Sequence, residues 1–423
     1  MQPIRTRPHH PSPKPLLGKD LRPQGPPNLA GESLLVLYWL AFCLYETVFA
    51  STTISGFFYP FYLAFLAVVL AMLFTRGIRL WSPAILLYVA LLLAVAAGFV
   101  GFQEPIDFGP IQRVVAYLLG LIATVLVQSR RGLHLLTTGV VLTAVAVASW
   151  VVSQAFIGGF AYRGNIETDP NVAAFYLAPG AITAVALLRF ALLSRASFLL
   201  LVGSALASLI TLYASLLLAS RGMTIALVLA LIMLLLHGVR TDARRLGFIL
   251  VLLALAGGAF LLPGGQGLVE RFTSERVESG GSRIPIWGTT LRSYSESSPQ
   301  HLLLGHGMDA SKRVVQNASG SLTSTHNAYL QWLYEFGFVG LTLFLALHAV
   351  VFQRGRSLRE PWGAMAVGVM TFLLAACLTV NATDGFLYWV ALAFVISIAT
   401  FAPSVTGTQP LRNMNQGVRH APR

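Results

Sequence analysis

Long apolar stretches, separated by short polar segments, run along most of the chain. Each stretch is close to the ~20 residues that an α-helix needs to cross a hydrocarbon layer of ~30 Å. The pattern therefore predicts an all-α integral membrane protein with about twelve transmembrane helices. The predicted spans are residues 33–50, 57–74, 80–101, 112–128, 133–152, 172–188, 198–219, 222–238, 246–262, 328–352, 362–380 and 385–402.

The composition agrees with this pattern. Hydrophobic residues make up 56% of the chain and charged residues 11%, and the mean hydropathy is +0.71, which is too apolar for a soluble domain with a polar surface. We expect a membrane domain over residues 33–402, flanked by a Pro-rich basic tail (1–32) and a second tail (403–423). One loop, residues 264–325, is much longer than the others. Because the net charge of +13 is divided by the membrane and not gathered on one soluble face, the lipid bilayer is an expected partner and nucleic acid is not.

The basic residues are distributed unevenly between the two sides of the predicted membrane domain. The two tails and the loops that follow the second, fourth, sixth, eighth and tenth spans hold 20 of the 29 Lys and Arg residues. They hold only four of the 16 acidic residues. The positive-inside rule places these segments in the cytoplasm and the loop 264–325 on the outer face. Cys43 and Cys377 both fall within spans, so no disulfide framework is expected. We find no metal-ligand spacing and expect no metal.

The long outer loop has a helical pattern of its own. Ser282 can cap a short helix in which Ile284, Trp287, Leu291 and Tyr294 recur at helical spacing, with Pro299 at its end. We expect this helix to lie on the membrane surface with its apolar side down. Arg283, at its start, faces the polar side or the cavity beneath the helix, and the simplest interpretation is an interfacial helix with a snorkelling arginine.

Arg221 is the one charged residue between Phe198 and Leu236. Two spans fit into this length only if the chain turns tightly at Ser220-Arg221-Gly222, at the outer edge of the hydrocarbon layer. A charge at that depth is costly unless it snorkels or has a partner, so Arg221 is a candidate functional residue.

The segment before the sixth span reads YRGNIETDPNVAAFYL. Asp169, Pro170 and Asn171 are typical of a helix start, with Asp or Asn as the cap. This structural role is the simplest interpretation of Asp169 and Asn171. No comparable structural role in the local sequence explains Arg163.

The tenth span is preceded by His326 and Asn327 and contains Glu335. On a continuous helix, His326 and Glu335 differ by nine residues, which separates them by half a turn and ~13.5 Å. They are therefore not expected to form a direct pair. We expect Glu335 to make a polar contact with a neighbouring span, where Gly337 and Gly340 allow another helix to approach closely.

The order of these motifs resembles the O-antigen ligase and polymerase superfamily of bacterial polysaccharide-assembly proteins. The resemblance covers most of residues 160–345. It rests on Asp-Pro-Asn before a span, Ser-Arg-Gly between two spans, the Arg283–Trp287 segment, the Gly305–Gly307 turn, and HNAYLQWLYEFGFVG from His326 onwards.

The resemblance implies a fold related to the C-type membrane glycosyltransferases, and a site on the outer face of the bacterial plasma (inner) membrane. It implies a glycan donor linked to undecaprenyl pyrophosphate, with no metal or other cofactor. It maps the essential pyrophosphate-handling arginines onto Arg221 and Arg283, and the essential histidine onto His326.

The residue types suit this chemistry. Two arginines can hold phosphate oxygens bidentately, which Lys cannot do, and a histidine near neutral pKa can accept the proton of an attacking hydroxyl. We expect Arg163, Asn327 and Trp287 to contact the substrate. The predicted function is an inverting O-antigen ligase with an acceptor of the lipid A-core type. The alternatives are a polymerase that uses the same donor and a second glycan chain as acceptor, and a transporter of lipid-linked sugars.

Overall fold

The structure is a computed structural model that describes residues 82–100, 108–127, 129–157, 170–194, 196–218, 220–238, 283–319 and 324–404. These residues form α-helices, one short 3-10 helix and no β-strand. The prediction of an all-α membrane protein is confirmed. The predicted spans 33–50, 57–74 and 246–262 lie outside the described residues.

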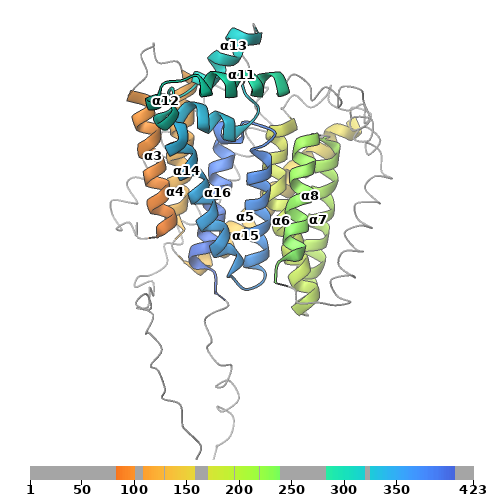
Figure 1. Cartoon of the computed structure of the whole chain (residues 1–423). Coiled ribbons are helices and arrows are strands. Elements are labelled where there is room, and N and C mark those ends of the chain that lie inside the picture. Colours follow the sequence, from red (N-terminus) through yellow and green to blue (C-terminus); the bar gives the residue numbers. More distant parts are fainter. Residues whose placement is uncertain are drawn as a thin grey trace, which may run out of the picture.

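Within this part of the chain, nine helices form a bundle in which they run side by side (Figure 1). Four of them, α5, α6, α7 and α14, are long and apolar enough to cross a membrane. The bundle helices are α3 (Pro83–Val100), α4 (Phe108–Leu126), α5 (Arg130–Ile157), α6 (Pro170–Ser194), α7 (Phe198–Leu217), α8 (Arg221–Leu236), α14 (Ala328–Arg356), α15 (Trp362–Ala376) and α16 (Phe386–Phe401). They correspond to nine of the twelve predicted spans.

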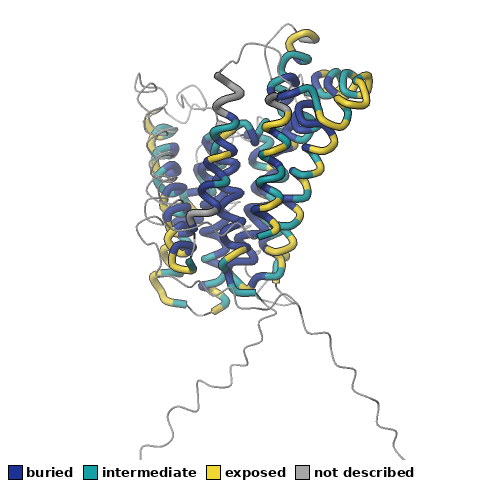
Figure 2. Tube along the Cα trace, turned by 90° about the vertical axis from the view of Figure 1, so that its left-hand side faces the viewer, coloured by how far each residue is buried: buried dark blue, intermediate teal, exposed yellow. Residues whose placement is uncertain are grey.

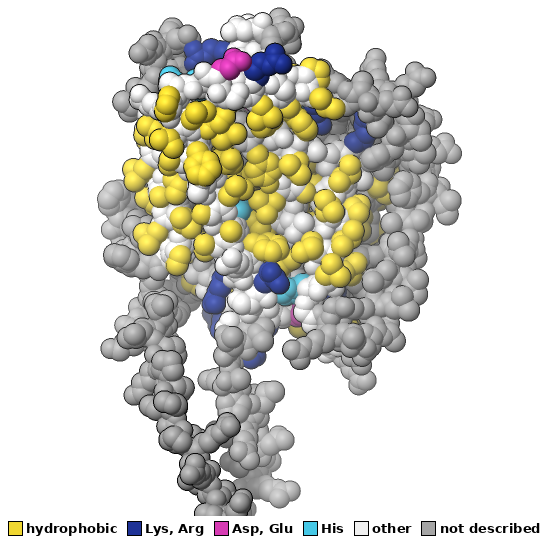
Figure 3. Space-filling model, viewed as in Figure 1, with side chains coloured by type: hydrophobic (Ala, Val, Ile, Leu, Met, Phe, Trp, Pro, Cys, Tyr) yellow, Lys and Arg dark blue, Asp and Glu magenta, His cyan; other side chains and the backbone are white. Residues whose placement is uncertain are grey.

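The helices α15 and α16 form the centre of the bundle. Nearly every residue of both helices is buried, as expected of helices that are apolar on all sides. In α7, by contrast, large apolar side chains such as Phe198 and Leu206 are exposed. Figure 2 shows this division, with buried residues on the inner faces of the helices and exposed ones at the rim. On the face drawn in Figure 3, hydrophobic side chains form a broad band, and Lys and Arg lie at its two ends. This is the surface expected of a protein that lies in a bilayer.

Three short helices lie across one end of the bundle: α11 (Arg283–Ser295), α12 (Pro299–Leu304) and α13 (Ala310–Ser319) (Figure 1). The predicted surface helix is α11. It ends at Ser295, before Pro299, and Pro299 instead starts α12 after the capping residue Ser298. The face that α11 buries in the protein is centred on Ile286 and Thr290. Ile284 and Leu291 of the predicted apolar stripe are 61% and 45% exposed.

Helix α14 is broken at Gly337, whose φ of 64° is outside the helical range. The break frees the carbonyl groups of Tyr334 and Glu335 from their usual partners within the helix. The turn at Gly305–Gly307 supplies new partners, because the N–H groups of His306 and Gly307 donate to these carbonyls at 3.0 and 2.9 Å. A Cβ atom on Gly337 would lie 2.3 Å from the carbonyl oxygen of Leu303. Because Gly337 has no side chain, the end of α12 and the turn that follows it can pack against the backbone of α14 at the break.

The closest contacts at Gly340 lie within α14 itself. The atoms nearest to a Cβ atom there would belong to Phe336 and Trp332 of the same helix. The bend at Gly337 folds the two halves of α14 towards each other, so this glycine relieves crowding within α14.

Candidate functional site

The Ser-Arg-Gly motif lies at the tight connection between α7, which ends at Leu217, and α8, which starts at Arg221. The Ser220 hydroxyl donates to the side-chain oxygen of Asn171, in the first turn of α6, at 2.6 Å. Two motifs separated by 49 residues therefore meet at one end of the bundle. Asp169 and Arg163 lie outside the described residues.

Gly222 brings a third segment to the same place. A Cβ atom on Gly222 would lie 2.4 Å from the hydroxyl oxygen of Thr379, so only glycine allows this approach. Thr379 belongs to the connection between α15 and α16, which contains the 3-10 helix η4 (Ala382–Asp384). No role for this connection was predicted from the sequence.

The connection between α15 and α16 also forms hydrogen bonds with the segment that contains His326. The N–H of Ala328 donates to the carbonyl of Cys377 at 2.8 Å. The Thr325 hydroxyl is within hydrogen-bond distance of the Asn381 side-chain oxygen at 3.1 Å and of the Asn327 carbonyl at 3.0 Å. The residues on both sides of His326 are thus fixed to the core of the bundle.

His326 itself has a φ of 50°, a conformation that non-glycine residues adopt infrequently. It precedes α14, which begins at Ala328, so the assumption of a continuous helix from His326 to Glu335 is wrong. Helix α14 begins after His326 because the side chain of Asn327 caps it, accepting the Leu330 N–H at 3.1 Å. Sparsely populated backbone conformations cluster at functional sites, where the surrounding contacts hold them.

Helix α11 packs onto the His326 segment. The indole N–H of Trp287 donates to the carbonyl of Thr325, the residue before His326, at 2.8 Å. Arg283 lies four residues before Trp287, one turn away on the same face of α11. This hydrogen bond therefore brings the start of α11, with Arg283, to the segment of His326.

Arg221 and Arg283 share one electrostatic environment. Burial, and then the positive charge of Arg221, lower the pKa of the Arg283 guanidinium. Neither arginine forms an ion pair with a carboxylate of the described residues. Two nearby cations without an acidic partner repel each other, and an anion bound between them relieves this repulsion.

Trp287 and Asn327 were predicted to bind the substrate. In the structure, the N–H of Trp287 and the side-chain oxygen of Asn327 are both engaged within the protein. These two atoms position the His326 segment. The part of each side chain left for a substrate is the indole ring of Trp287 and the amide nitrogen of Asn327.

Arg113 of α4 is the centre of a buried charge cluster that the sequence pattern did not predict. Its guanidinium lies 2.8 Å from Asp309, 2.7 Å from Glu335 and 2.8 Å from Asp384. Glu335 is fully buried and also accepts the Ser311 hydroxyl at 2.6 Å. The contact of Glu335 with a neighbouring span is thus made through Arg113.

The charge cluster connects the outer helices to the bundle. Asp309 lies between α12 and α13, Glu335 in α14 and Asp384 in η4. Burial raises the pKa of the Asp309 carboxyl, but Arg113 and Lys312 outweigh burial and hold this pKa below its usual value. Asp309 is therefore ionised at neutral pH and keeps the turn between α12 and α13 against α4.

The fold and the site define a class: a helical membrane protein in which two arginines and a histidine are held at one end of the bundle, under a cover of short helices. Residues 206–345 match the family profile described as O-antigen ligase. These residues contain Arg221, Arg283 and His326. The resemblance of this chain to the O-antigen ligase superfamily is thereby confirmed.

A curated protein named O-antigen ligase, from Pseudomonas aeruginosa strain PAO1, is 33% identical to this chain over 190 residues. The aligned region covers 42% of this chain and 43% of that relative. The chain therefore matches less than half the length of this curated protein.

Proposed function

We propose that this protein is an O-antigen ligase that transfers a glycan from undecaprenyl pyrophosphate to an acceptor hydroxyl of the lipid A-core type. One observation carries the proposal. The Arg221–Arg283 pair and the strained His326 belong to the segment that matches the O-antigen ligase profile, and the packing of α11 brings their segments together.

The two arginines suit the leaving group. In the proposed reaction, the bond between the anomeric carbon and the pyrophosphate oxygen breaks, and the lipid pyrophosphate leaves with the bonding electron pair. Arg221 and Arg283 hold the phosphate oxygens through their planar guanidinium groups and stabilise the developing negative charge. Because they lack carboxylate partners among the described residues, the anion does not have to displace an existing ion pair.

His326 is proposed as the general base. The acceptor hydroxyl attacks the anomeric carbon from the side opposite the pyrophosphate, and His326 accepts the hydroxyl proton as the new C–O bond forms. This attack inverts the anomeric centre. The sugar 1-pyrophosphate is already activated, so positioning, charge stabilisation and one base are sufficient, and no metal is required.

We place this site on the outer face of the plasma membrane. The basic loops at the opposite end of the bundle support this orientation through the positive-inside rule. The proposed donor and acceptor are both lipid-linked, so they can reach the covered end of the bundle from the outer leaflet.

The polymerase alternative is tested by the surface glycans of a deletion strain, separated on a gel. Loss of a ligase removes all glycan-capped chains from the lipid A-core. Loss of a polymerase leaves the lipid A-core capped with a single repeat unit. A single-repeat product contradicts the ligase proposal, and an unchanged pattern contradicts both functions.

A further inference from the structure

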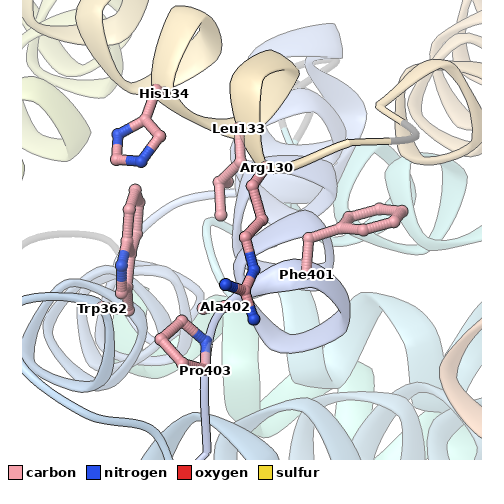
Figure 4. Close-up of a pocket in the computed structure, with 7 residues that line it drawn as sticks. All are labelled: Arg130, Leu133, His134, Trp362, Phe401, Ala402 and Pro403. Atoms are coloured by element: carbon pink, nitrogen blue, oxygen red, sulfur yellow. The ribbon is translucent and has the colours of Figure 1, made fainter. Parts of the chain in front are cut away.

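A cavity of about 120 Å³ lies at the end of the bundle opposite the proposed site. It lies between the starts of α5 and α15 and the end of α16 (Figure 4). A molecule of liquid water occupies ~30 Å³, so the cavity has room for a group of several heavy atoms but not for a whole lipid. Its lining residues are Arg130, Leu133, His134, Trp362, Phe401, Ala402 and Pro403.

The walls of this cavity are held firmly. The His134 and Trp362 rings pack edge to face, with 5.0 Å between the ring centroids. Figure 4 shows them on one side of the cavity. At the end of α16, the carbonyl of Pro403 accepts the Arg359 N–H at 3.1 Å. The carbonyl of Ala399 accepts the Arg354 side-chain N–H at 3.2 Å. The cavity is therefore part of the packed fold.

The charge of the cavity is positive. Arg130 is exposed, forms no ion pair with the described residues, and turns its guanidinium towards Ala402 and Pro403 in Figure 4. None of the described lining residues is acidic. Glu360, in the nearby connection between α14 and α15, is paired with Arg189 at 3.2 Å. Arg130 thus remains available to an external anion.

We propose that this cavity binds the phosphodiester headgroup of an anionic phospholipid in the adjacent leaflet. Arg130 supplies a planar donor group for the phosphate oxygens, and Trp362 is a residue type that is enriched where bilayer and water meet. Basic pockets between transmembrane helices on the cytoplasmic side recognise anionic lipid headgroups in this way.

Two features favour a lipid over a free phosphate ion. Leu133, Trp362 and Phe401 line the cavity with apolar surface that can pack against the glycerol carbons next to a phosphodiester, which a free phosphate ion lacks. Leu135 and Leu142 of α5 are 38% and 56% exposed, which leaves apolar surface for acyl chains on the helix that carries Arg130. The inference does not depend on the proposed function, because the cavity and the ligase site lie at opposite ends of the bundle.

The test measures binding of short-chain phosphatidylglycerol to the purified full-length protein in a neutral detergent, from the shift of its thermal unfolding midpoint. Short-chain phosphatidylcholine and inorganic phosphate are the comparison ligands. The variants are Arg130→Gln and, as a matched control, Arg131→Gln, because Arg131 is the exposed neighbour that does not line the cavity. An interfacial arginine contributes about fivefold to the affinity for an anionic lipid, so Arg130→Gln should bind phosphatidylglycerol about fivefold more weakly.

Support requires that phosphatidylglycerol stabilises the wild type and Arg131→Gln alike, and Arg130→Gln less. Equal binding by the two variants, or equal stabilisation by phosphatidylcholine, would overturn the proposal. Equal stabilisation by inorganic phosphate would identify a site for free phosphate and reject the lipid. If Arg130→Gln does not accumulate, Arg130→Ala and Arg131→Ala decide: weaker binding by Arg130→Ala supports the proposal, and equal binding rejects it.

Discussion

At the scale of single residues, the geometry of the guanidinium group matters as much as its charge. Arg221→Lys and Arg283→Lys each keep a positive charge but lose the planar fork that matches two phosphate oxygens. We expect both variants to transfer glycan almost as poorly as the corresponding Ala variants. The measurement is the rate of transfer from a lipid-linked donor at matched protein levels. Near-normal transfer by both Lys variants would show that these arginines only snorkel.

The role of His326 can be distinguished from that of the two arginines by measuring donor binding and glycan transfer separately. His326→Ala removes the proposed base, and the change occurs at a partly exposed position before α14. Transfer should fall by ~10²-fold or more, the scale of a general base, whereas donor binding should be retained. Donor binding and transfer are measured on the same detergent-solubilised variant. A proportional loss of both would leave His326 as a positioning residue.

At the scale of elements, the pattern of apolar and polar residues predicted the bundle helices well, since the length of a span and its apolar character are local properties. It also predicted α11 from the helical spacing of its apolar residues, whereas the proposed cap, Ser282, lies outside the described residues. It could not predict the cluster around Arg113, whose partners Asp309 and Glu335 lie 196 and 222 residues further along the chain. A single charge at the end of a span has the same pattern whether it snorkels or is buried in an ion pair.

The break in α14 was missed for a related reason. Gly337 in an apolar span has the same local pattern in a straight helix as in a broken one, and only the docking of Gly305–Gly307 distinguishes the two. The residues of the candidate site differ in how clearly the sequence marks them. Arg221 and Arg283 stand out as costly charges near the membrane, whereas Asn381 and Thr379 are ordinary polar residues in a short connection.

Gly337→Ala tests the break directly. An Ala residue at a φ of 64° is strained, and its Cβ atom would lie 2.3 Å from a backbone oxygen that cannot easily move. We expect a loss of at least ~2 kcal/mol in the free energy of unfolding. Gly288→Ala in α11 is the control, because nothing lies within 4 Å of its Cβ position and alanine favours a helix. Thermal unfolding of both variants in detergent gives the comparison; equal midpoints would contradict the role assigned to Gly337.

At the scale of the whole molecule, the charge cluster around Arg113 joins the outer helices to the bundle. Arg113→Met leaves the fully buried Glu335 without its cation, and breaking a buried pair in this way costs ~3–5 kcal/mol. The double variant Arg113→Met, Glu335→Gln should lose less than Arg113→Met alone, because the unpaired charge is removed. Unfolding midpoints of the two variants test this coupling. Arg292→Met, at an exposed position of α11, should change little, and a loss as large as that of Arg113→Met would argue against the cluster.

The orientation in the membrane is a second property of the whole molecule. We expect cysteines placed at the exposed positions Glu296, Gln300 and Asn317 to react with an impermeant thiol reagent in intact spheroplasts. A cysteine at Arg131 should react only after lysis. Both experiments start from a chain in which Cys43 and Cys377 are replaced by Ser. The reverse labelling pattern would reject the outer-face site together with the proposed donor and acceptor.

The way in which the Gly305–Gly307 turn completes α14 also bears on how the chain is assembled. A carbonyl group without a partner is costly inside a membrane, and the broken form of α14 would have two such groups without the docked turn. The turn precedes α14 in the chain, so it has already been synthesised when α14 enters the bilayer. The hydrogen-bond donors that α14 lacks are thus supplied by the part of the chain made just before it. The break in α14 can therefore form on insertion, before the connection between α15 and α16 completes the contacts at the start of this helix.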